Sequence, residues 1–465
     1  MGYYDYYNSN ERNDKIQLSD HFSYSRLVRF ATPSIIMMIC TTIYGVVDGF
    51  FISNFVGKTA FASVNLILPF LQIIGSMGVI LGADGSALIA RALGSGDKDK
   101  AGRYFTMTMI ATLLGGLLFT AVGLVMLRPM AYLLGATDEM IEDCVTYGGI
   151  CLLFNLFYLA QRVFQEYLVV AEKPRFALKI MLITGTTNIV LDLLFVHPAF
   201  LNMGVTGAAI STGICEALAA AIPFVWFVSN RNRTALRFRR THMEWDVLRR
   251  AGVTGSSDTI SAMSASVIGM LYNMQLMHYA GENGVAAYGV VMYASFVFTA
   301  VFSGYSVGTA PIMGYHYGAG NQAEMRNVLK KSMAMLSVAA VTMVTLISLL
   351  ARPFSAIFVG YDWKLLDLTT RAFIICMLPY LMMWLNSYLS TVLTALDKGP
   401  LAAVLTACRV IVFPVVCIIF MPLLWELDGV WFALTGAEFL GMLVIGIAFL
   451  TQKRKFGFQL RHRKK

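Results

Sequence analysis

Acidic and amide side chains interrupt two strongly apolar stretches of this sequence. Asp48 lies in the apolar run 30–55, and Asn188 and Asp192 lie four residues apart in the run 176–196. That spacing places Asn188 and Asp192 on one face of a helix. An ionisable side chain inside a membrane helix costs about 2.5 to 3.5 kcal/mol on insertion scales, so it indicates a function by default. A buried acid suits a proton, and hard oxygen ligands suit a sodium ion.

A threonine in a third apolar run extends this polar group. Thr212 lies in the run 204–229, and the topology derived below places it in the outer half of the membrane with the two aspartates. Two carboxylates, an amide and a hydroxyl could therefore converge on one cation. The alternative is that Asp48 and Asp192 are separate structural acids, each satisfied by its own neighbours.

Other polar residues in the apolar runs could line a substrate cavity. Arg162 and Glu166 are spaced i, i+4, so this pair could equally neutralise itself on one helix. Asp258 could instead cap a kinked helix. The acids whose roles stay open between structure and cavity are Asp84, Glu216 and Glu438. The candidate cavity residues are Tyr44, Gln161, Arg162, Gln165, Glu166, Asp258 and Tyr272.

The composition indicates which solvent surrounds these residues. Of the 465 residues, 57% are hydrophobic and 14% are charged, whereas an average soluble domain has about 25% charged residues. A bilayer core of about 30 Å needs roughly 20 apolar residues per helix. We therefore predict an all-α integral membrane protein with twelve transmembrane helices. The predicted spans are 30–55, 64–92, 104–127, 144–170, 176–196, 204–229, 251–278, 286–316, 332–351, 372–394, 401–424 and 429–450.

Lysine and arginine in the short loops predict the orientation of these helices, because basic loops stay in the cytoplasm. Loops on the opposite side carry acidic residues, as at 138–143 and 426–428. We expect the protein to lie in the cytoplasmic (inner) membrane with both termini in the cytoplasm. The basic segments that fall on the predicted cytoplasmic side are 98–103, 173–175, 231–240, 330–331 and 453–465.

An internal repeat divides the chain into two halves. Gly57 recurs as Gly281, 224 residues later (281 − 57), and Arg128-Pro129 recurs at the same offset as Arg352-Pro353. Six helices per half return the chain to its starting side, so the halves have parallel topology. In transporters with this arrangement the substrate path lies between the halves.

The repeat predicts five segments. They are a cytoplasmic leader (1–29), an N-lobe with the first six spans (30–229), a basic cytoplasmic linker (230–250), a C-lobe with the last six spans (251–450) and a basic cytoplasmic tail (451–465).

Several classes of function find no support in the sequence. The seven cysteines form no CxxC pair, so we predict neither a disulfide framework nor a zinc site. No HExxH or GxSxG motif occurs, and we expect neither enzyme activity nor a cofactor. The basic residues lie between apolar runs and beyond the last of them, so we expect the lipid bilayer, and no nucleic acid, as a macromolecular partner.

Short motifs along residues 25–450 carry a resemblance to a known family. In this order they resemble the bacterial branch of the multidrug and toxic compound extrusion (MATE) family. The motifs are Val47-Asp48-Gly49, Gly57, Ala60, Ala62, Pro69, Gly94-Ser95-Gly96-Asp97 with Ala101, Asn188-Ile189-Val190-Leu191-Asp192, Gly204-Val205-Thr206-Gly207-Ala208-Ala209-Ile210-Ser211-Thr212 and Pro311-Ile312-Met313-Gly314-Tyr315-His316-Tyr317-Gly318-Ala319.

The resemblance implies a two-lobe exporter that exchanges cationic or amphipathic drugs or dyes for protons or sodium by alternating access. It implies that the residues coupling transport to the cation are Asp48, Asn188, Asp192 and Thr212, with sodium possible at Asp48 and Asp192. We expect the chain to function as a monomer.

Two positions depart from the family pattern. Leu193 stands where the family often has a proline, and Ser266 stands where some members carry a glutamate. The second departure weakens the case for a C-lobe sodium site and favours protons.

Two other transporter types stay open. Residues 99–103 resemble a loop of the major facilitator superfamily, although Ser95 replaces its leading glycine. A flippase for lipid-linked sugars would need a large basic cavity, whereas the charges predicted inside the lobes here are mostly acidic.

Overall fold

The N-terminal half of the chain forms a bundle of long helices. The computed structural model describes residues 16–229, 236–239, 241, 244–360, 362–396 and 398–452, and of 246–263 only the backbone. All regular structure in this described part is helical. The helices of the N-lobe are α2 (Tyr24–Phe51), the π-helical turn η1 (Ile52–Val56), α3 (Lys58–Gly94), α4 (Lys98–Leu133), α5 (Ile141–Val170), α6 (Pro174–Val196) and α7 (Gly204–Val228).

The C-terminal half forms a second bundle. Its first helix contains two spans that meet at Gly281, where φ is 60°. The helices of the C-lobe are α8 (Trp245–Gly318), α9 (Gln322–Leu349), α10 (Ala351–Val359), α11 (Trp363–Met377), α12 (Tyr380–Ala395), α13 (Gly399–Ala407), the π-helical turn η2 (Cys408–Val412) and α14 (Phe413–Gln452).

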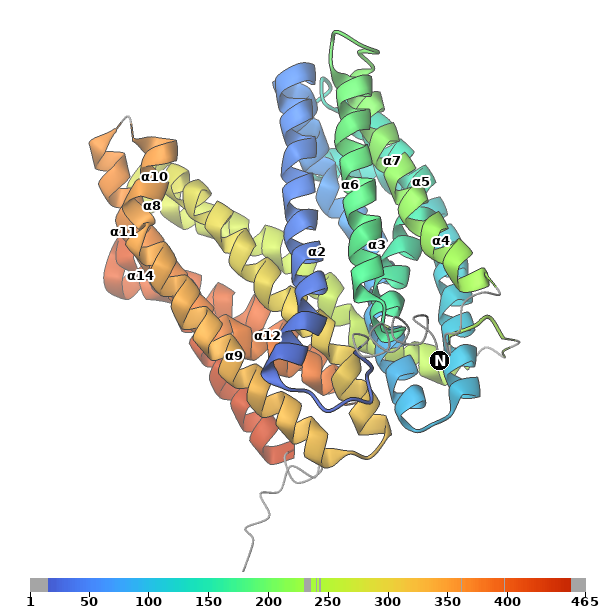
Figure 1. Cartoon of the computed structure of the whole chain (residues 1–465). Helices are drawn as coiled ribbons and strands as arrows, with labels where there is room; N and C mark the ends of the chain where they lie inside the picture. The colour runs from blue at the N-terminus through green and yellow to red at the C-terminus, as the bar shows by residue number, and fades with distance from the viewer. Residues whose placement is uncertain are drawn as a thin grey trace, which may run out of the picture.

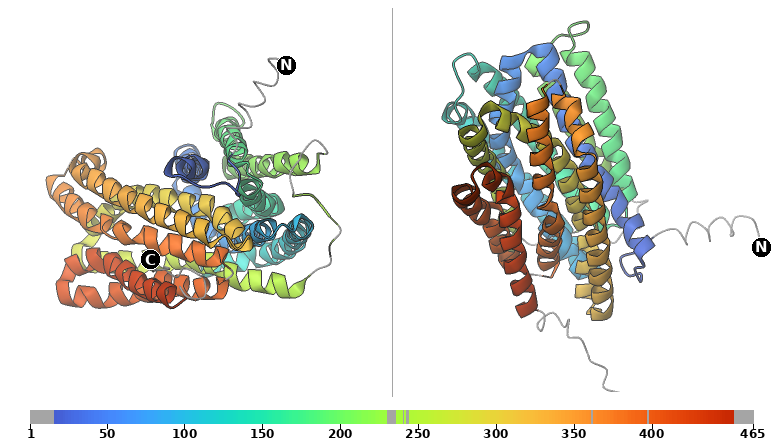
Figure 2. Two further views of the ribbon diagram at one scale, coloured as in Figure 1. Left: turned by 60° about the horizontal axis from the view of Figure 1, so that its bottom comes forward. Right: turned by 90° about the vertical axis from the view of Figure 1, so that its left-hand side faces the viewer.

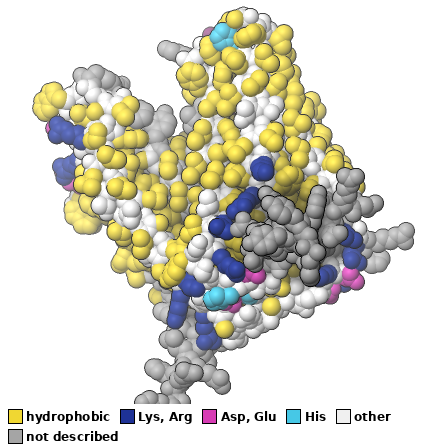
Figure 3. All heavy atoms as spheres, in the orientation of Figure 1, with side chains coloured by type: hydrophobic (Ala, Val, Ile, Leu, Met, Phe, Trp, Pro, Cys, Tyr) yellow, Lys and Arg dark blue, Asp and Glu magenta, His cyan; other side chains and the backbone are white. Residues whose placement is uncertain are grey.

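The helices are long and apolar enough to cross a membrane. Ten described segments meet this condition. One of them, Pro400–Phe449, holds two spans because the backbone leaves the helical conformation at Trp425 and Glu426. The half of α8 before Gly281 adds another span, which gives the predicted twelve. Large apolar side chains face outward, such as Leu118 and Val125 of α4, which are 62% and 71% exposed, and hydrophobic side chains dominate the visible surface (Figure 3).

The two lobes meet at one end and splay apart at the other (Figures 1 and 2). At the meeting end α3 and α8 finish and α4 and α9 begin, and we call it the closed end. Two repeat-related glycines bring the helices together there. A Cβ atom on Gly94 would lie 1.8 Å from Tyr315 O, and one on Gly318 would lie 2.0 Å from Arg91 O. Only glycine permits this approach of α3 to α8.

The repeat is visible in the local geometry of both halves. Asp97 caps the N-terminus of α4 by accepting the Lys100 N–H at 2.8 Å, and Asn321 caps α9 by accepting the Glu324 N–H at 3.1 Å. Asp97 and Asn321 stand at the same 224-residue offset as the glycine pairs. The same sequence pattern therefore ends and restarts the helix in each lobe.

The segment boundaries can be compared only in part. Much of the predicted linker 230–250, the tail from residue 453 and the first fifteen residues of the leader lie outside the described residues. The short helix α10, which follows α9 directly, was not predicted.

Candidate functional site

Three polar side chains meet inside the N-lobe, on α6 and α7. The Ser211 hydroxyl of α7 donates a hydrogen bond to Asp192 Oδ1 of α6 and accepts one of 3.2 Å from Asn188 Nδ2. Asp192 and Ser211 are both 0% exposed. This arrangement brings the predicted pair Asn188 and Asp192 together, one turn apart on the same face of α6.

Asp48 of α2 joins this group. Its carboxyl and that of Asp192 act directly on one another, and we refer to the two as the carboxyl pair. Asp48 Oδ1 and Asp192 Oδ2 are buried, and no described residue donates a hydrogen bond to either atom. Just beyond Asp48, α2 continues into η1, whose first amide, Ile52 N–H, bonds back to Asp48 O. Such π-helical turns occur frequently at functional sites.

The hydroxyl in this group comes from Ser211 rather than from the predicted Thr212. Thr212 is half-buried, and no hydrogen bond of its side chain joins it to Asp48, Asn188 or Asp192. The reason is helical register, because successive residues of a helix point about 100° apart. Ser211 lies on the buried small-residue face of α7 with Ala208.

Two further residues, which the sequence did not single out, lie in the neighbourhood of the carboxyl pair. Tyr147 and Cys151 of α5 both lie within the electrostatic reach of Asp48 and of Glu216 on α7. Tyr147 is 3% exposed. Their i, i+4 spacing on a helix that also carries polar residues was the available signal.

A cavity of about 280 Å³ lies between the lobes, and we call it the inter-lobe cavity. Three of the predicted cavity residues line it, Arg162, Gln165 and Glu166 of α5. Most of its other polar lining consists of hydroxyl groups. The residues around the cavity are Ser34, Met37, Met38 and Thr41 of α2, Ala83 of α3, Arg162, Gln165, Glu166 and Val169 of α5, Ser303, Ser306 and Val307 of α8, and Ser387 and Thr391 of α12.

Two other predicted cavity residues lie close to this space without lining it. Gln161 accepts a hydrogen bond of 3.4 Å from Gln165 Nε2. The Tyr44 ring packs against the backbone of α6, where a Cβ atom on Gly185 would lie 2.0 Å from the ring. Along α2, Tyr44 lies between Thr41, which lines the inter-lobe cavity, and Asp48.

The prediction for Tyr272 is not supported by its position. Tyr272 is 0% exposed in the core of the C-lobe, where its hydroxyl donates to Val430 O at 2.6 Å and its ring stacks on Tyr288. The repeat offset alone did not predict which face of α8 this side chain occupies. Asp258 lies in the part of α8 whose side chains fall outside the described residues.

Glu438, left open by the sequence, belongs to a largely buried ion pair in the C-lobe, with both side chains about 15% exposed. Arg409 on η2 contacts both Glu438 oxygens, with Nη2 at 2.9 Å from Oε1. Asn386 of α12 donates to Glu438 Oε2 at 2.6 Å. These contacts favour a structural role for Glu438. Arg409 was overlooked, although a single arginine within the apolar run 401–424 is a signal in itself. Asp84 of α3 is buried.

Comparison with known proteins identifies the family. The MatE family model matches residues 33–194 and 259–419. The chain belongs to the MATE family. Both matched segments lie in corresponding places of the two lobes, which agrees with the repeat. Membership in the MATE family overturns the major facilitator alternative.

Relatives of this MATE chain match it nearly end to end. The multidrug export protein MepA of Staphylococcus aureus (strain MRSA252) is 22% identical over 433 residues, which are 93% of this chain and 94% of that protein. MepA of Staphylococcus haemolyticus (strain JCSC1435) is 23% identical over 429 residues, 91% and 93% of the two chains.

Solved structures share the fold. An outward-facing multidrug resistance MATE transporter of the MOP superfamily superposes with a TM-score of 0.88 at 21% identity, over 96% of this chain and 99% of that one. A MOP superfamily transporter from Pyrococcus furiosus, described as having a binding pocket of reverse polarity that suggests a different function, superposes with a TM-score of 0.82 at 22% identity, over 96% and 98%. The twelve-helix, two-repeat membrane fold is thereby established.

Proposed function

We propose that this MATE transporter exports cationic or amphipathic drugs from the cell in exchange for protons. The match to MepA multidrug export proteins over 93% of the chain supports drugs as substrates. The fold alone does not decide the substrate, since one structural neighbour is described as differing in pocket polarity. The proposal therefore depends on the two sites.

The observation that carries the proposal is the carboxyl pair. Asp48 Oδ1 and Asp192 Oδ2 are buried without a donor among the described residues, and a buried charged oxygen left unpaired is costly. A single proton bound by the pair removes this cost, because a protonated carboxyl donates a hydrogen bond to its ionised neighbour.

Sodium is the alternative coupling ion. It would need several oxygen ligands, and the nearby candidates are Asp48, Asn188, Asp192 and Ser211. In the described part of the chain no cluster of three or more His, Cys, Asp or Glu side chains could hold a metal ion. The ion would then depend on neutral oxygens as well as on the carboxyl pair, which is why we favour the proton.

The inter-lobe cavity is the proposed drug site. Glu166 supplies a carboxylate, while Met37 and Met38 supply flexible apolar surface that adapts to varied shapes. At about 280 Å³ the cavity is slightly smaller than typical drug pockets of about 300 to 1,000 Å³. The lobes therefore have to move to admit a drug.

The proposed cycle uses the two ends of the molecule in turn. With the closed end in the cytoplasm, as the basic loops predict, protons from outside reach the buried carboxyl pair from the splayed end. Protonation bends α2 near η1, the drug leaves, and the lobes reverse their opening. One proton exchanged for one monovalent drug gives about 1.4 kcal/mol, or tenfold accumulation, per pH unit.

Ethidium transport in proteoliposomes tests the proposal. We expect an imposed pH gradient to drive dye movement, and the Asp48→Asn and Asp192→Asn variants to abolish it while remaining folded. Glu142→Gln is the matched control, since this carboxylate is exposed at the start of α5 and pairs with Arg128 instead of with either aspartate. Dye movement driven by a sodium gradient alone would identify sodium as the coupling ion. If folded protein moves no dye under either gradient, the flippase is favoured. If both asparagine variants keep full activity, the carboxyl pair is not the coupling site.

A further inference from the structure

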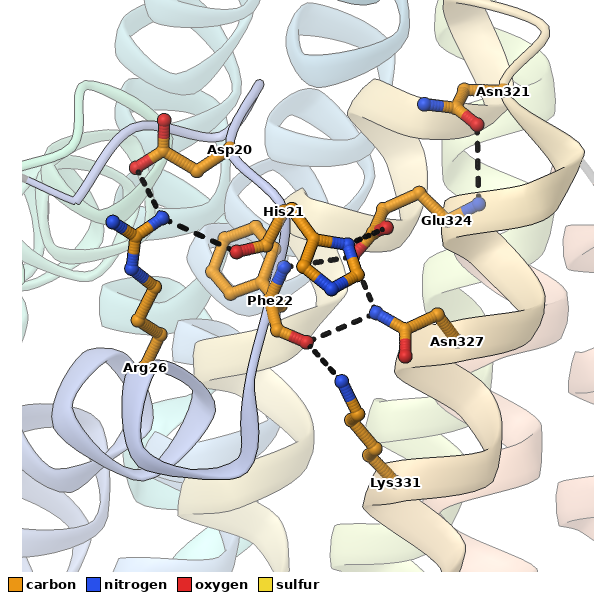
Figure 4. Close-up of polar contacts among 8 residues, drawn as sticks. All are labelled: Asp20, His21, Phe22, Arg26, Asn321, Glu324, Asn327 and Lys331. Atoms are coloured by element: carbon orange, nitrogen blue, oxygen red, sulfur yellow. Dashed lines mark hydrogen bonds and ion pairs between the residues drawn. The ribbon is translucent and has the colours of Figure 1, made fainter.

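The segment that precedes α2 connects the two lobes at the closed end. Residues 16–22 run from the corner between α5 and α6 to the start of α9, and Figure 4 shows the second of these attachments. We call residues 16–22 the strap. Its turn is stabilised from within, since the Asp20 N–H donates to Gln17 O at 3.1 Å and the Gln17 N–H donates to Asp20 Oδ2 at 3.1 Å.

On the N-lobe side the strap is held by Glu172. The Leu18 N–H donates to Glu172 Oε1 at 2.7 Å, and the Leu18 side chain is 1% exposed. Glu172 adopts a positive φ of 61° in the connection between α5 and α6. Burial raises the pKa of the Glu172 carboxyl, and the hydrogen bond from Leu18 acts in the opposite direction. The Leu18 N–H thus donates a hydrogen bond that water would donate to this carboxylate if it were exposed.

On the C-lobe side the strap is held by α9. Glu324 accepts the Phe22 N–H at 2.8 Å through Oε1 and contacts His21 Nδ1 at 2.6 Å through Oε2. Phe22 O in turn accepts from Asn327 Nδ2 at 2.9 Å and Lys331 Nζ at 2.7 Å. Every polar group of the Phe22 backbone is therefore bonded to the C-lobe (Figure 4).

Apolar packing strengthens the C-lobe attachment. The Phe22 side chain is 0% exposed, and its ring lies edge-on to His316 at the end of α8, with centroids 6.4 Å apart. Leu27 and Phe30, in the first turns of α2, belong to the same hydrophobic core as the C-lobe residues. The hydrogen bond from Leu18 to Glu172 is thus the contact that attaches the strap to the N-lobe.

The lobes separate at the closed end when the transporter opens there, so a segment bonded to both lobes must release one of them. Its bonds are hydrogen bonds to carboxylates and from an ammonium group, which are stronger than neutral ones. We propose that the strap is a positioning element of the transport cycle, one that holds the lobes together at the closed end and sets how readily this end opens. This inference rests on the alternating opening in the proposed function.

The test measures the distance between the lobes at the closed end. Spin labels at exposed Lys98 and Gln322, introduced by unnatural amino acids because the chain has seven cysteines, report it by pulsed electron resonance. We expect Glu172→Ala to raise the ratio of open to closed molecules about tenfold, the effect of losing one hydrogen bond to a charged group, and Glu324→Ala, which removes the contacts to both Phe22 and His21, to raise it at least as much. Glu142→Ala, at the other end of α5, is the control and should leave the ratio unchanged.

Combining the two substitutions separates a strap from two independent stabilising contacts. A strap acts only while both attachments hold, so the double variant should open little more than either single variant. Additive effects, or unchanged distances in both single variants, would overturn the proposal. Glu324→Gln keeps the shape and one acceptor oxygen, and it serves if Glu324→Ala does not fold.

The measurement needs neither drug nor ion gradient. Distances that respond as expected in a protein that exports no dye would therefore leave the strap standing while the proposed function fails. Unchanged distances in a protein that does export dye would overturn the strap and leave the proposed function standing.

Discussion

Ser211 and Thr212 are neighbours in the sequence, yet their side chains have different surroundings. Ser211 is 0% exposed and bonded to Asp192 and Asn188, whereas Thr212 is half-buried outside this group. A hydroxyl bonded to a buried carboxylate influences how readily that carboxylate takes up a proton. At the scale of single residues, the two positions therefore make different contributions to the proposed coupling.

We expect Ser211→Ala to slow proton-driven dye export roughly tenfold, since losing a hydrogen bond to a charged group costs about 1.5 to 3 kcal/mol. Thr212→Val keeps the neighbouring volume and should stay near the unsubstituted rate. Initial rates in proteoliposomes under one fixed pH gradient compare the two. The reverse ranking would assign the hydroxyl to Thr212.

The ion pair of the C-lobe leads to a prediction about stability. Arg409 and Glu438 have side chains only 14% and 15% exposed, and removing one partner of a buried pair costs about 3 to 5 kcal/mol. We expect Arg409→Met to lower the unfolding temperature in detergent clearly, and the double variant Arg409→Met with Glu438→Gln to recover part of the loss. A double variant less stable than the single one would contradict a simple pairing role.

At the scale of helices, the crossing of α3 and α8 is controlled by two glycines. We expect Gly94→Ala and Gly318→Ala to weaken the closed end, because each new methyl group would fall about 2 Å from a backbone oxygen of the other helix and such overpacking costs about 1 to 3 kcal/mol. The spin-label distance across the closed end should lengthen. Gly289→Ala, which meets no atom within 4 Å, is the control, and an equal response there would remove the explanation.

The helices could be predicted because apolar runs of membrane length can be read from a short window of sequence. The repeat could be predicted because identical residues recur at one offset, as Gly57 and Gly281 do. The faces of the helices were harder to predict. Tyr272 was misplaced because the repeat offset gives its place along the chain and not the face of α8 that it occupies, and no pattern in residues 16–22 predicts that they contact Glu172 and Glu324.

At the scale of the whole molecule, charge decides which end faces the cell interior. The described part of the closed end carries the basic residues 98–103 and 330–331, and basic loops are retained in the cytoplasm. The loop 134–140 lies at the other end of α4 and has no lysine or arginine. The molecule therefore has one predicted orientation with both termini inside.

Reporter fusions test this orientation. A fluorescent protein fused after Lys465 should fluoresce in intact cells, because such reporters mature in the cytoplasm. Alkaline phosphatase inserted in the loop 134–140 should be active, because it folds only outside. The opposite pattern from both reporters would invert the orientation and, with it, the direction of the proposed export.

Helix α2 contributes to both proposed sites. Thr41 lines the inter-lobe cavity and Asp48 belongs to the carboxyl pair, and their seven-residue separation corresponds to about 10 Å along the helix axis. Drug and proton therefore contact different atoms of one helix and do not compete for a shared position. Their effects on each other must then be reciprocal at equilibrium. The factor by which bound drug weakens proton uptake must equal the factor by which bound proton weakens drug binding.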